Sequence, residues 1–158
     1  SDVCSSDLEA ILAERQRQVD RQLVAPEIAE KLDVSRIRRF VEGEAFAKIC
    51  AADEVLRELA FITALPAEAV LAAQGTEGVR AEGEQVLVQG IADLVLVYPD
   101  HLELLDYKTD RRKTEADFLR AYRAQLNLYA LAIDKRFAPK KVTYKGICSL
   151  ELGKLIEV

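Results

Sequence analysis

The sequence predicts an α/β fold, in which a mixed sheet is flanked by helices and preceded by an amino-terminal helical segment. Residues 9–50 have apolar side chains at helical spacing. Residues 55–65, 86–98 and 101–108 are instead rich in Val, Ile and Leu, as strands are. One long helical pattern then separates these strands from two more at the carboxyl end, and this order is typical of an α/β domain.

The composition sets limits on the class of protein. The chain has 158 residues, half of them hydrophobic, which is enough for one domain with a core. It contains neither a bilayer-length apolar run nor a cleavable signal pattern, so we expect a soluble, cytoplasmic protein. The net charge of −5 is unfavourable for binding DNA unaided, because affinity comes largely from neutralising phosphates. A partner domain could supply that affinity.

The chain has three widely spaced cysteines, Cys4, Cys50 and Cys148. This spacing matches neither a disulfide framework nor a zinc motif, so we expect unpaired thiols. An iron–sulfur cluster needs about four cysteine ligands, and we therefore expect none.

The amino-terminal part is expected to be helical. Residues 1–8 are polar and differ in character from the rest of the chain; we expect them to be non-native or disordered, with Asp7 available as a helix cap. Residues 9–158 are expected to form one domain. Helices are predicted for residues 9–22, for 26–32 after Pro26, and from a cap at Asp33 or Ser35 to about Cys50.

The remaining elements are predicted from period changes and turn residues. Pro66 ends the first strand, and a loop with Gly75, Gly78 and Gly83 comes next. Residues 86–98 indicate one long strand, or a strand with a bulge at Gly90. Pro99-Asp100 forms a turn before the strand 101–108. A helix runs from a capping box at Thr114 and Asp117 to about Arg136, and two final strands join near Gly153.

The segment LLDYKTD, residues 104–110, indicates chemistry. In a strand, Asp106 and Lys108 point to the same face while Tyr107 points away. Burying a carboxylate and an ammonium among apolar residues is costly unless they pair or bind a ligand. Taken alone, such a D-x-K pattern more often indicates an ordinary ion pair.

A second carboxylate, Asp93, shifts that balance towards a site. Asp93 and Asp106 are nearly equidistant from the turn at Pro99-Asp100, so the hairpin can place them opposite each other. Two carboxylates and a lysine suit metal-assisted phosphodiester cleavage. Magnesium prefers hard oxygen ligands, and the bound metal stabilises charge and activates water. The lysine can orient that water or stabilise developing charge.

The next helix contains QLNLYA, residues 125–130. Gln125 and Tyr129 are four residues apart and share one helical face, with Tyr122 and Arg123 nearby. Such a pair is more often a packing or solvated face, but beside two carboxylates it could line a groove and hold a phosphate or base.

Together, the pattern Gly90-x-x-Asp93, the segment LLDYKTD and the segment QLNLYA resemble the PD-(D/E)xK nucleases of the RecB type. Within that family the chain is similar to the carboxy-terminal nuclease domains of the AddA helicase–nuclease family. The preceding RELAFITALPAEAV resembles the family's REVPF-type segment, with its glutamate at Glu58. The resemblance covers about residue 34 to the end, and it implies a restriction-endonuclease-like mixed sheet.

The resemblance implies a role for each matching position. Asp93, Asp106 and the main-chain carbonyl of Tyr107 would bind Mg²⁺, for which Mn²⁺ could substitute. Lys108 would be the catalytic lysine and Glu58 a supporting residue. Gln125 and Tyr129 would complete the catalytic set. It also implies DNA as substrate, helicase domains in the same parent chain, and a second, AddB-like subunit. The task would be the processing of double-strand breaks for recombinational repair.

The sequence departs from the family at one position. The family has a metal-binding histidine on an amino-terminal helix, whereas the only histidine here is His101, in the turn before the catalytic strand. The expected position falls in or before residues 1–8. Glu9 or Glu14 are possible substitutes.

Three functions therefore remain open. The first is an active Mg²⁺-dependent deoxyribonuclease. The second is a catalytically weak or inactive module that docks or guides DNA. The third is a stand-alone exonuclease of the RecB type.

Overall fold

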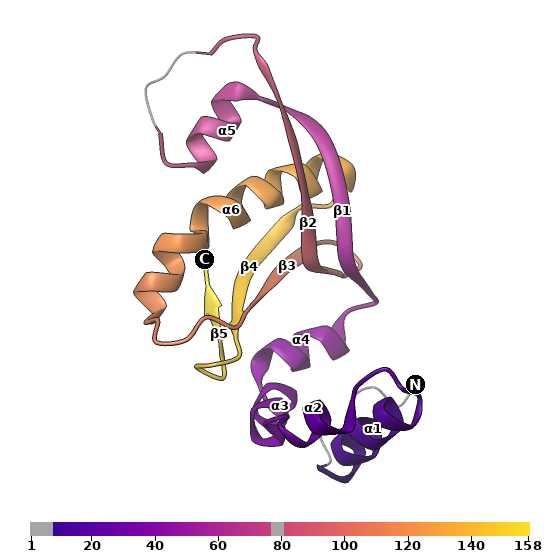
Figure 1. The fold of residues 1–158 in the computed structure, drawn as a ribbon. Helices are drawn as coiled ribbons and strands as arrows, with labels where there is room; N and C mark the ends of the chain where they lie inside the picture. Colours follow the sequence, from indigo (N-terminus) through magenta and orange to yellow (C-terminus); the bar gives the residue numbers. More distant parts are fainter. Residues whose placement is uncertain (1–7, 77–80) are drawn as a thin grey trace.

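The computed structural model describes residues 8–76 and 81–158, and the predictions for Cys4, Asp7 and Gly78 lie outside these ranges. Figure 1 shows the helices and strands in their order along the chain. The helices are α1 (Leu8–Asp20), α2 (Pro26–Glu30), α3 (Val34–Val41), α4 (Glu44–Ala51), α5 (Ala67–Ala73) and α6 (Glu115–Arg136). The strands are β1 (Glu54–Pro66), β2 (Gln85–Val97), β3 (Leu102–Lys108), β4 (Val142–Ser149) and β5 (Lys154–Glu157).

The described strands form one five-stranded sheet in the order β1-β2-β3-β4-β5. All neighbours pair antiparallel except β3 and β4, which are parallel. A parallel pair needs a long crossover connection, and α6 supplies it. The predicted mixed sheet flanked by helices is thereby confirmed.

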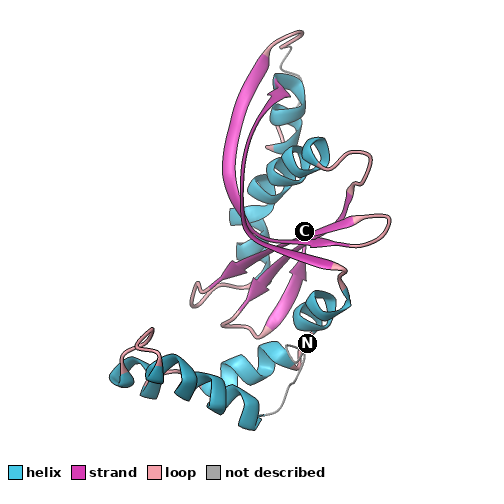
Figure 2. Ribbon diagram, turned by 90° about the vertical axis from the view of Figure 1, so that its right-hand side faces the viewer, coloured by secondary structure: helices cyan, strands magenta, loops and turns pink. Residues whose placement is uncertain are grey.

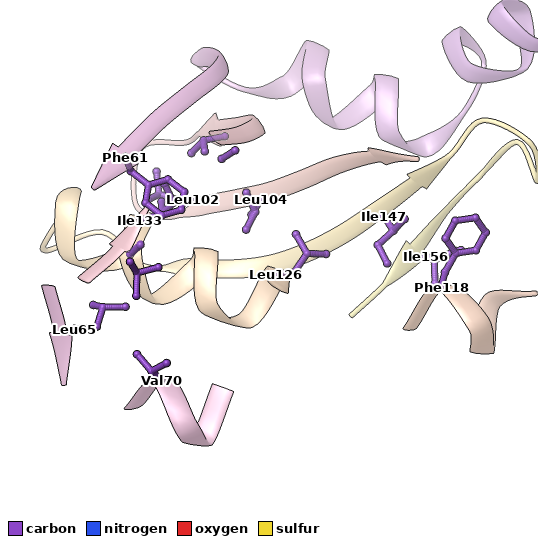
Figure 3. Packing of buried hydrophobic residues seen from close by; sticks show 14 residues of the cluster. Phe61, Leu65, Val70, Leu102, Leu104, Phe118, Leu126, Ile133, Ile147 and Ile156 are labelled. Carbon is purple, nitrogen blue, oxygen red and sulfur yellow. The ribbon is translucent and has the colours of Figure 1, made fainter. Parts of the chain in front are cut away.

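Helices cover the two faces of the sheet unequally. On one face, α6 packs with α5 against the larger apolar cluster, part of which Figure 3 shows as sticks. Phe118, Leu126 and Ile133 of α6 are fully buried there. On the other face, α4 packs through Ala45 and Ile49 against a smaller cluster that includes Leu105 and Cys148.

The alternation of faces slips by one residue in β1 and in β2. Leu56 and Leu59 of β1 both pack into the α6-side cluster, as do Ala92 and Val95 of β2. Residues three apart in a regular strand point to opposite faces, so each strand contains one extra residue between them.

The two irregularities lie at the same level of the hairpin. Arg57 pairs with Leu94 and Leu59 pairs with Ala92, which leaves Glu58 opposite Asp93 without a regular pairing. Glu58 has a φ of 50°, which is uncommon for a residue other than glycine. Bulged residues bend a strand, and Figure 2 shows the β1–β2 hairpin curving away from the other strands.

Several local predictions need correction. The single helix expected up to Cys50 is two helices, because α3 ends at Val41 and α4 begins after Gly43. A Cβ at Gly43 would lie 3.0 Å from the carbonyl oxygen of Arg39, so the close approach of the two helices favours glycine. The loop expected after Pro66 begins with α5, whose sequence AEAVLAA is rich in helix formers.

Two further expectations differ from the structure. Gly90 pairs with Phe61 in an unbroken register, so the bulge is at Asp93 and not at Gly90. Cys50 is disulfide-bonded, whereas Cys148 is a free, buried thiol. Within the described residues, no helix is long and apolar enough to cross a membrane.

Candidate active site

The candidate site lies where β2 and β3 separate. Their pairing runs from Val97↔Leu102 to Leu94↔Leu105 and stops there. The next position in this register would bring Asp93 opposite Asp106, as the hairpin geometry predicts. Beyond it, β3 continues beside β4 to Lys108, while β2 continues only beside β1. We call this opening between the two strands the fork.

Asp93 closes one side of the fork through a hydrogen bond to the main chain. Its Oδ2 accepts from the Tyr107 N–H at 2.9 Å, in place of a backbone acceptor on β2. The N–H and C=O of a strand residue point to the same side. The Tyr107 carbonyl therefore also faces the fork, next to Asp93.

Asp106 is buried at the fork, with 4% of its surface exposed. Its Oδ2 forms an ion pair with the Nζ of Lys108, two residues further along the same face of β3. Burial raises the pKa of Asp106 above its ordinary value, and the negative charge of Asp93 adds to the rise. Lys108 opposes this rise without cancelling it.

A thiol on the neighbouring strand experiences the same electrostatic environment. Cys148 of β4 is paired in register with Tyr107 and is 2% exposed. Burial, followed by the charges of Asp106 and Asp93, raises the pKa of Cys148 to about 12. Negative charge is thus concentrated in a poorly solvated part of the sheet, where a cation would be favoured.

The other predicted site residues lie around this centre. Glu58 lies on β1 opposite Asp93, and it is exposed. Tyr129 of α6 packs edge-on against Phe61, with ring centroids 4.9 Å apart. A Cβ at Gly90 would lie 2.7 Å from the Tyr129 hydroxyl, so Tyr129 occupies the space above that glycine.

Gln125 lies one turn before Tyr129 on α6 and is half-buried. Among the described residues it makes no hydrogen bond to Asp93, Asp106 or Lys108. The structure therefore brings together Asp93, Asp106, the Tyr107 main chain and Lys108. It places Gln125 and Tyr129 on the helix that covers this face.

Sequence reasoning missed a polar cluster formed by Asp110, Lys113 and Tyr122 beside Lys108. The Tyr122 hydroxyl donates to Asp110 Oδ2 at 2.9 Å, and Lys113 Nζ lies 2.7 Å from Asp110 Oδ1. The Lys108 Nζ lies 4.6 Å from the centroid of the Tyr122 ring. The sequence signal was present, because Asp110 ends the segment LLDYKTD and Tyr122 precedes Gln125 by three residues.

His101, the only histidine of the sequence, and Glu14, one of its two possible substitutes, make their contacts outside the fork. His101 precedes β3, at the end opposite the fork, where it stacks on Tyr98 and contacts Asp100 at 2.7 Å. Glu14 bonds to Arg17 and Gln18 of its own helix. In the described part of the chain, no three His, Cys, Asp or Glu side chains are grouped so that they could hold a metal.

The chain belongs to the PD-(D/E)XK nuclease superfamily, whose family model matches residues 1–154. The resemblance inferred from the motifs is thereby confirmed, and with it the restriction-endonuclease-like fold. Within this superfamily the chain is similar to AddA proteins, which are named as ATP-dependent helicase/nuclease subunits. It is 36% identical to the protein of Ligilactobacillus salivarius over 140 residues, which is 87% of this chain and 11% of that protein.

Two further relatives with the same name have similar coverage. The chain is 34% identical over 151 residues to the protein of Pelotomaculum thermopropionicum, and 31% identical over 150 residues to that of Lacticaseibacillus casei. Each alignment covers 94% of this chain and 12% of the relative. The chain therefore spans about one tenth of the length of these relatives, and it corresponds to a RecB-type nuclease segment of them.

Proposed function

We propose that this chain is a Mg²⁺-dependent nuclease domain that hydrolyses phosphodiester bonds in DNA. The observation that supports this most strongly is the fork, where Asp93, Asp106 and Lys108 meet on a buried part of the sheet. An ordinary ion pair would need only Asp106 and Lys108. Burial raises the pKa of Asp106 and the second carboxylate adds to the rise, so the ionised site without a cation is unfavourable, as expected of a cation-binding site.

The donor set of the fork fits a divalent metal. Asp93 and Asp106 would provide carboxylate oxygens, and the Tyr107 carbonyl faces the same opening. All three are hard oxygen donors, which suit Mg²⁺, and this ion usually keeps several water ligands and needs few from the protein. When bound, the metal would supply charge stabilisation at the phosphate and a more acidic water. Mn²⁺ would be accepted by the same oxygens.

Lys108 would serve the reaction through its position next to Asp106. With a cation held by Asp106, the Lys108 ammonium group would no longer be needed as the ion-pair partner and would be available to the scissile phosphate. There Lys108 would orient water or stabilise the developing negative charge. Glu58 would support the site from β1, and Gln125 and Tyr129 would line the covering helix, with Tyr129 fixing β2 through Gly90.

The names of the relatives support a wider context. AddA proteins, named as ATP-dependent helicase/nuclease subunits, contain a segment similar to this chain. We infer that helicase domains belong to the same parent protein, and that this protein pairs in the cytoplasm with a second, AddB-like subunit. The task would be exonucleolytic processing of double-strand breaks for recombinational repair. The helicase would supply DNA binding that a chain of net charge −5 lacks.

The test combines metal binding with cleavage. Calorimetry with Mn²⁺ or Mg²⁺ should show binding to the 158-residue chain that disappears in Asp106→Ala. Cleavage of single-stranded DNA should fall by about a hundredfold to a thousandfold in Asp106→Ala and in Lys108→Ala. Asp100→Ala and Lys141→Ala are matched controls, because both residues are exposed and lie beside the end of β3 opposite the fork. Unchanged cleavage by Lys108→Ala would overturn the proposal.

A docking or DNA-guiding module is the second candidate. The absence of a three-residue metal cluster among the described side chains favours it. Such a module needs no metal, so it would bind neither Mg²⁺ nor Mn²⁺ in an Asp106-dependent way. If the chain without substitutions binds metal but does not cleave DNA, the site lacks a ligand from the amino-terminal side.

A further inference from the structure

Lys108 lies between a negatively charged carboxylate and the face of an aromatic ring. On one side is the Asp106 carboxylate, with which its Nζ forms an ion pair. On the other side is the face of the Tyr122 ring, whose centroid lies 4.6 Å from the Nζ. An ammonium group within about 6 Å of an aromatic face is attracted by the ring's electron density, more strongly when both are partly desolvated. Lys108 has only 18% of its side chain exposed.

The Tyr122 ring is itself fixed by two neighbours. Its hydroxyl donates to Asp110 at 2.9 Å and accepts from Lys113 Nζ at 3.3 Å. Lys113 also bonds to Asp110, so the three side chains form a closed set. Lys113 and then Tyr122 lower the pKa of Asp110, which keeps that carboxylate ionised as the acceptor.

The start of α6 is fixed next to this cluster. Thr114 and Asp117 form a reciprocal capping box that fixes the start of α6 directly after Lys113. Phe118, one turn before Tyr122, is fully buried in the core. The capping box and the buried Phe118 therefore fix the position of the first turns of α6. This position places the Tyr122 ring beside Lys108.

We propose that Tyr122, held by Asp110 and Lys113, is a positioning residue that sets where the Lys108 ammonium group lies. This inference rests on the proposed nuclease function for its catalytic consequence, but the positioning itself is a property of the folded chain. If Asp106 held a metal instead of Lys108, the Tyr122 ring would still keep the ammonium group at the fork. Tyr122 touches neither DNA nor metal in this role.

A direct test is the NMR signal of the Lys108 ε-methylene protons in ¹³C-lysine-labelled chain. Protons above an aromatic ring are shifted upfield. The shift should be lost in Tyr122→Leu, which removes the ring, and largely kept in Tyr122→Phe. Tyr98→Leu is the matched control, because Tyr98 lies at the far end of β3 and does not contact Lys108. A Lys108 signal unchanged in Tyr122→Leu would overturn the inference.

The kinetic test separates positioning from simple loss of stability. Tyr122→Leu should lower kcat about threefold to thirtyfold, the size of a partly buried cation–π contact, and leave KM for DNA unchanged. Tyr122→Phe should recover most of that loss. If Phe and Leu reduce kcat equally, or if only KM changes, positioning by the ring is excluded.

The two proposals fail in different ways. If the chain without substitutions does not cleave DNA, the proposed function is contradicted. The NMR signal of Lys108 still tests the positioning by Tyr122. Asp110→Asn gives a second check if Tyr122→Leu does not fold. It keeps the ring but weakens its anchor, so the Lys108 shift should decrease without disappearing.

Discussion

The same strand, β2, behaves differently on the two sides of Asp93. After Asp93, the strand is packed on both faces, and Leu94, Val95 and Leu96 are at most 2% exposed. Before Asp93, residues 85–92 form an arm with β1 that is covered on one face only. On its other face Leu87 and Ile91 are more than half exposed, and the described residues do not cover them.

This difference shows how the fold separates two environments. Asp106 at the fork is buried, and there burial raises its pKa while the charge of Asp93 adds to the rise. The arm instead leaves an apolar face to solvent. The extra residue in each strand, Glu58 and Asp93, is the point where the sheet changes from one kind of packing to the other.

The largest effect on the arm is expected at Gly90. The change Gly90→Ala adds a Cβ that would lie 2.7 Å from the Tyr129 hydroxyl and 2.9 Å from the Phe61 ring. Overpacking of this kind costs about 1–3 kcal/mol of the free energy of unfolding, which urea denaturation would measure. Ala60→Val, on the exposed face of the same arm, is the control and should change stability by no more than about 0.5 kcal/mol.

A double-mutant cycle would identify the contact responsible. Adding Tyr129→Leu to Gly90→Ala removes the ring that the new methyl group meets. The combined loss of stability should then be smaller than the sum of the two single losses. Additive losses would show that Tyr129 does not occupy the space above Gly90.

The sequence predicted the arrangement of the side chains at the fork better than that of their surroundings. Alternation in a strand was enough to place Asp106 and Lys108 on one face, and the turn at Pro99-Asp100 was enough to bring Asp93 opposite. Both inferences use contacts that are local or separated by one hairpin. The metal-binding role of these residues stays a prediction.

The bend at Glu58 and Asp93 could not be predicted in the same way. Each strand contains one extra residue at the same level, so the pairing register on either side is unchanged. A pattern of apolar residues in one strand does not reveal that its partner slips too. The Tyr122 cluster was also missed: Asp110 and Tyr122 lie in or beside the two motif segments, but their contact depends on where α6 crosses β3 in space.

A second prediction concerns the fork and the pH dependence of stability. Asp106 has a pKa above its ordinary value in the folded chain, mainly through burial. The folded chain therefore binds its proton more tightly than the unfolded chain does, and stability falls as pH rises between the two pKa values. The resulting loss in the free energy of unfolding is fully present at pH values above the raised pKa. It disappears at pH values below the ordinary pKa of aspartate.

The change Asp106→Asn should remove this loss. At pH 7 the variant should be more stable in urea denaturation than the chain without substitutions, although it would lack the proposed metal ligand. The advantage should shrink as pH falls towards the ordinary pKa of aspartate. Asp100→Asn is a control of opposite sign, because the hydrogen bond from His101 lowers the pKa of Asp100. A less stable Asp106→Asn at pH 7 would contradict the argument.

The smallest effect is expected at the open edge of the arm. β1 is an edge strand, and cations at the end of α6 bond to its free carbonyls. Lys135 Nζ donates to the Ala64 oxygen at 2.7 Å, and Arg136 Nη1 donates to the Ala60 oxygen at 2.8 Å. Exposed edge strands can pair with another chain, and charged side chains along the edge oppose such pairing.

Replacing Lys135 and Arg136 together by alanine should lower the free energy of unfolding by no more than about 1 kcal/mol, because both side chains are exposed. Its clearer consequence would be concentration-dependent self-association in light scattering, since the freed edge borders the apolar face with Ile62 and Ile91. Replacing Arg21 and Lys31 removes the same charge far from the arm and should leave the light scattering unchanged. Equal scattering from both double variants would show that net charge, and not the capped edge, keeps the arms of separate molecules apart.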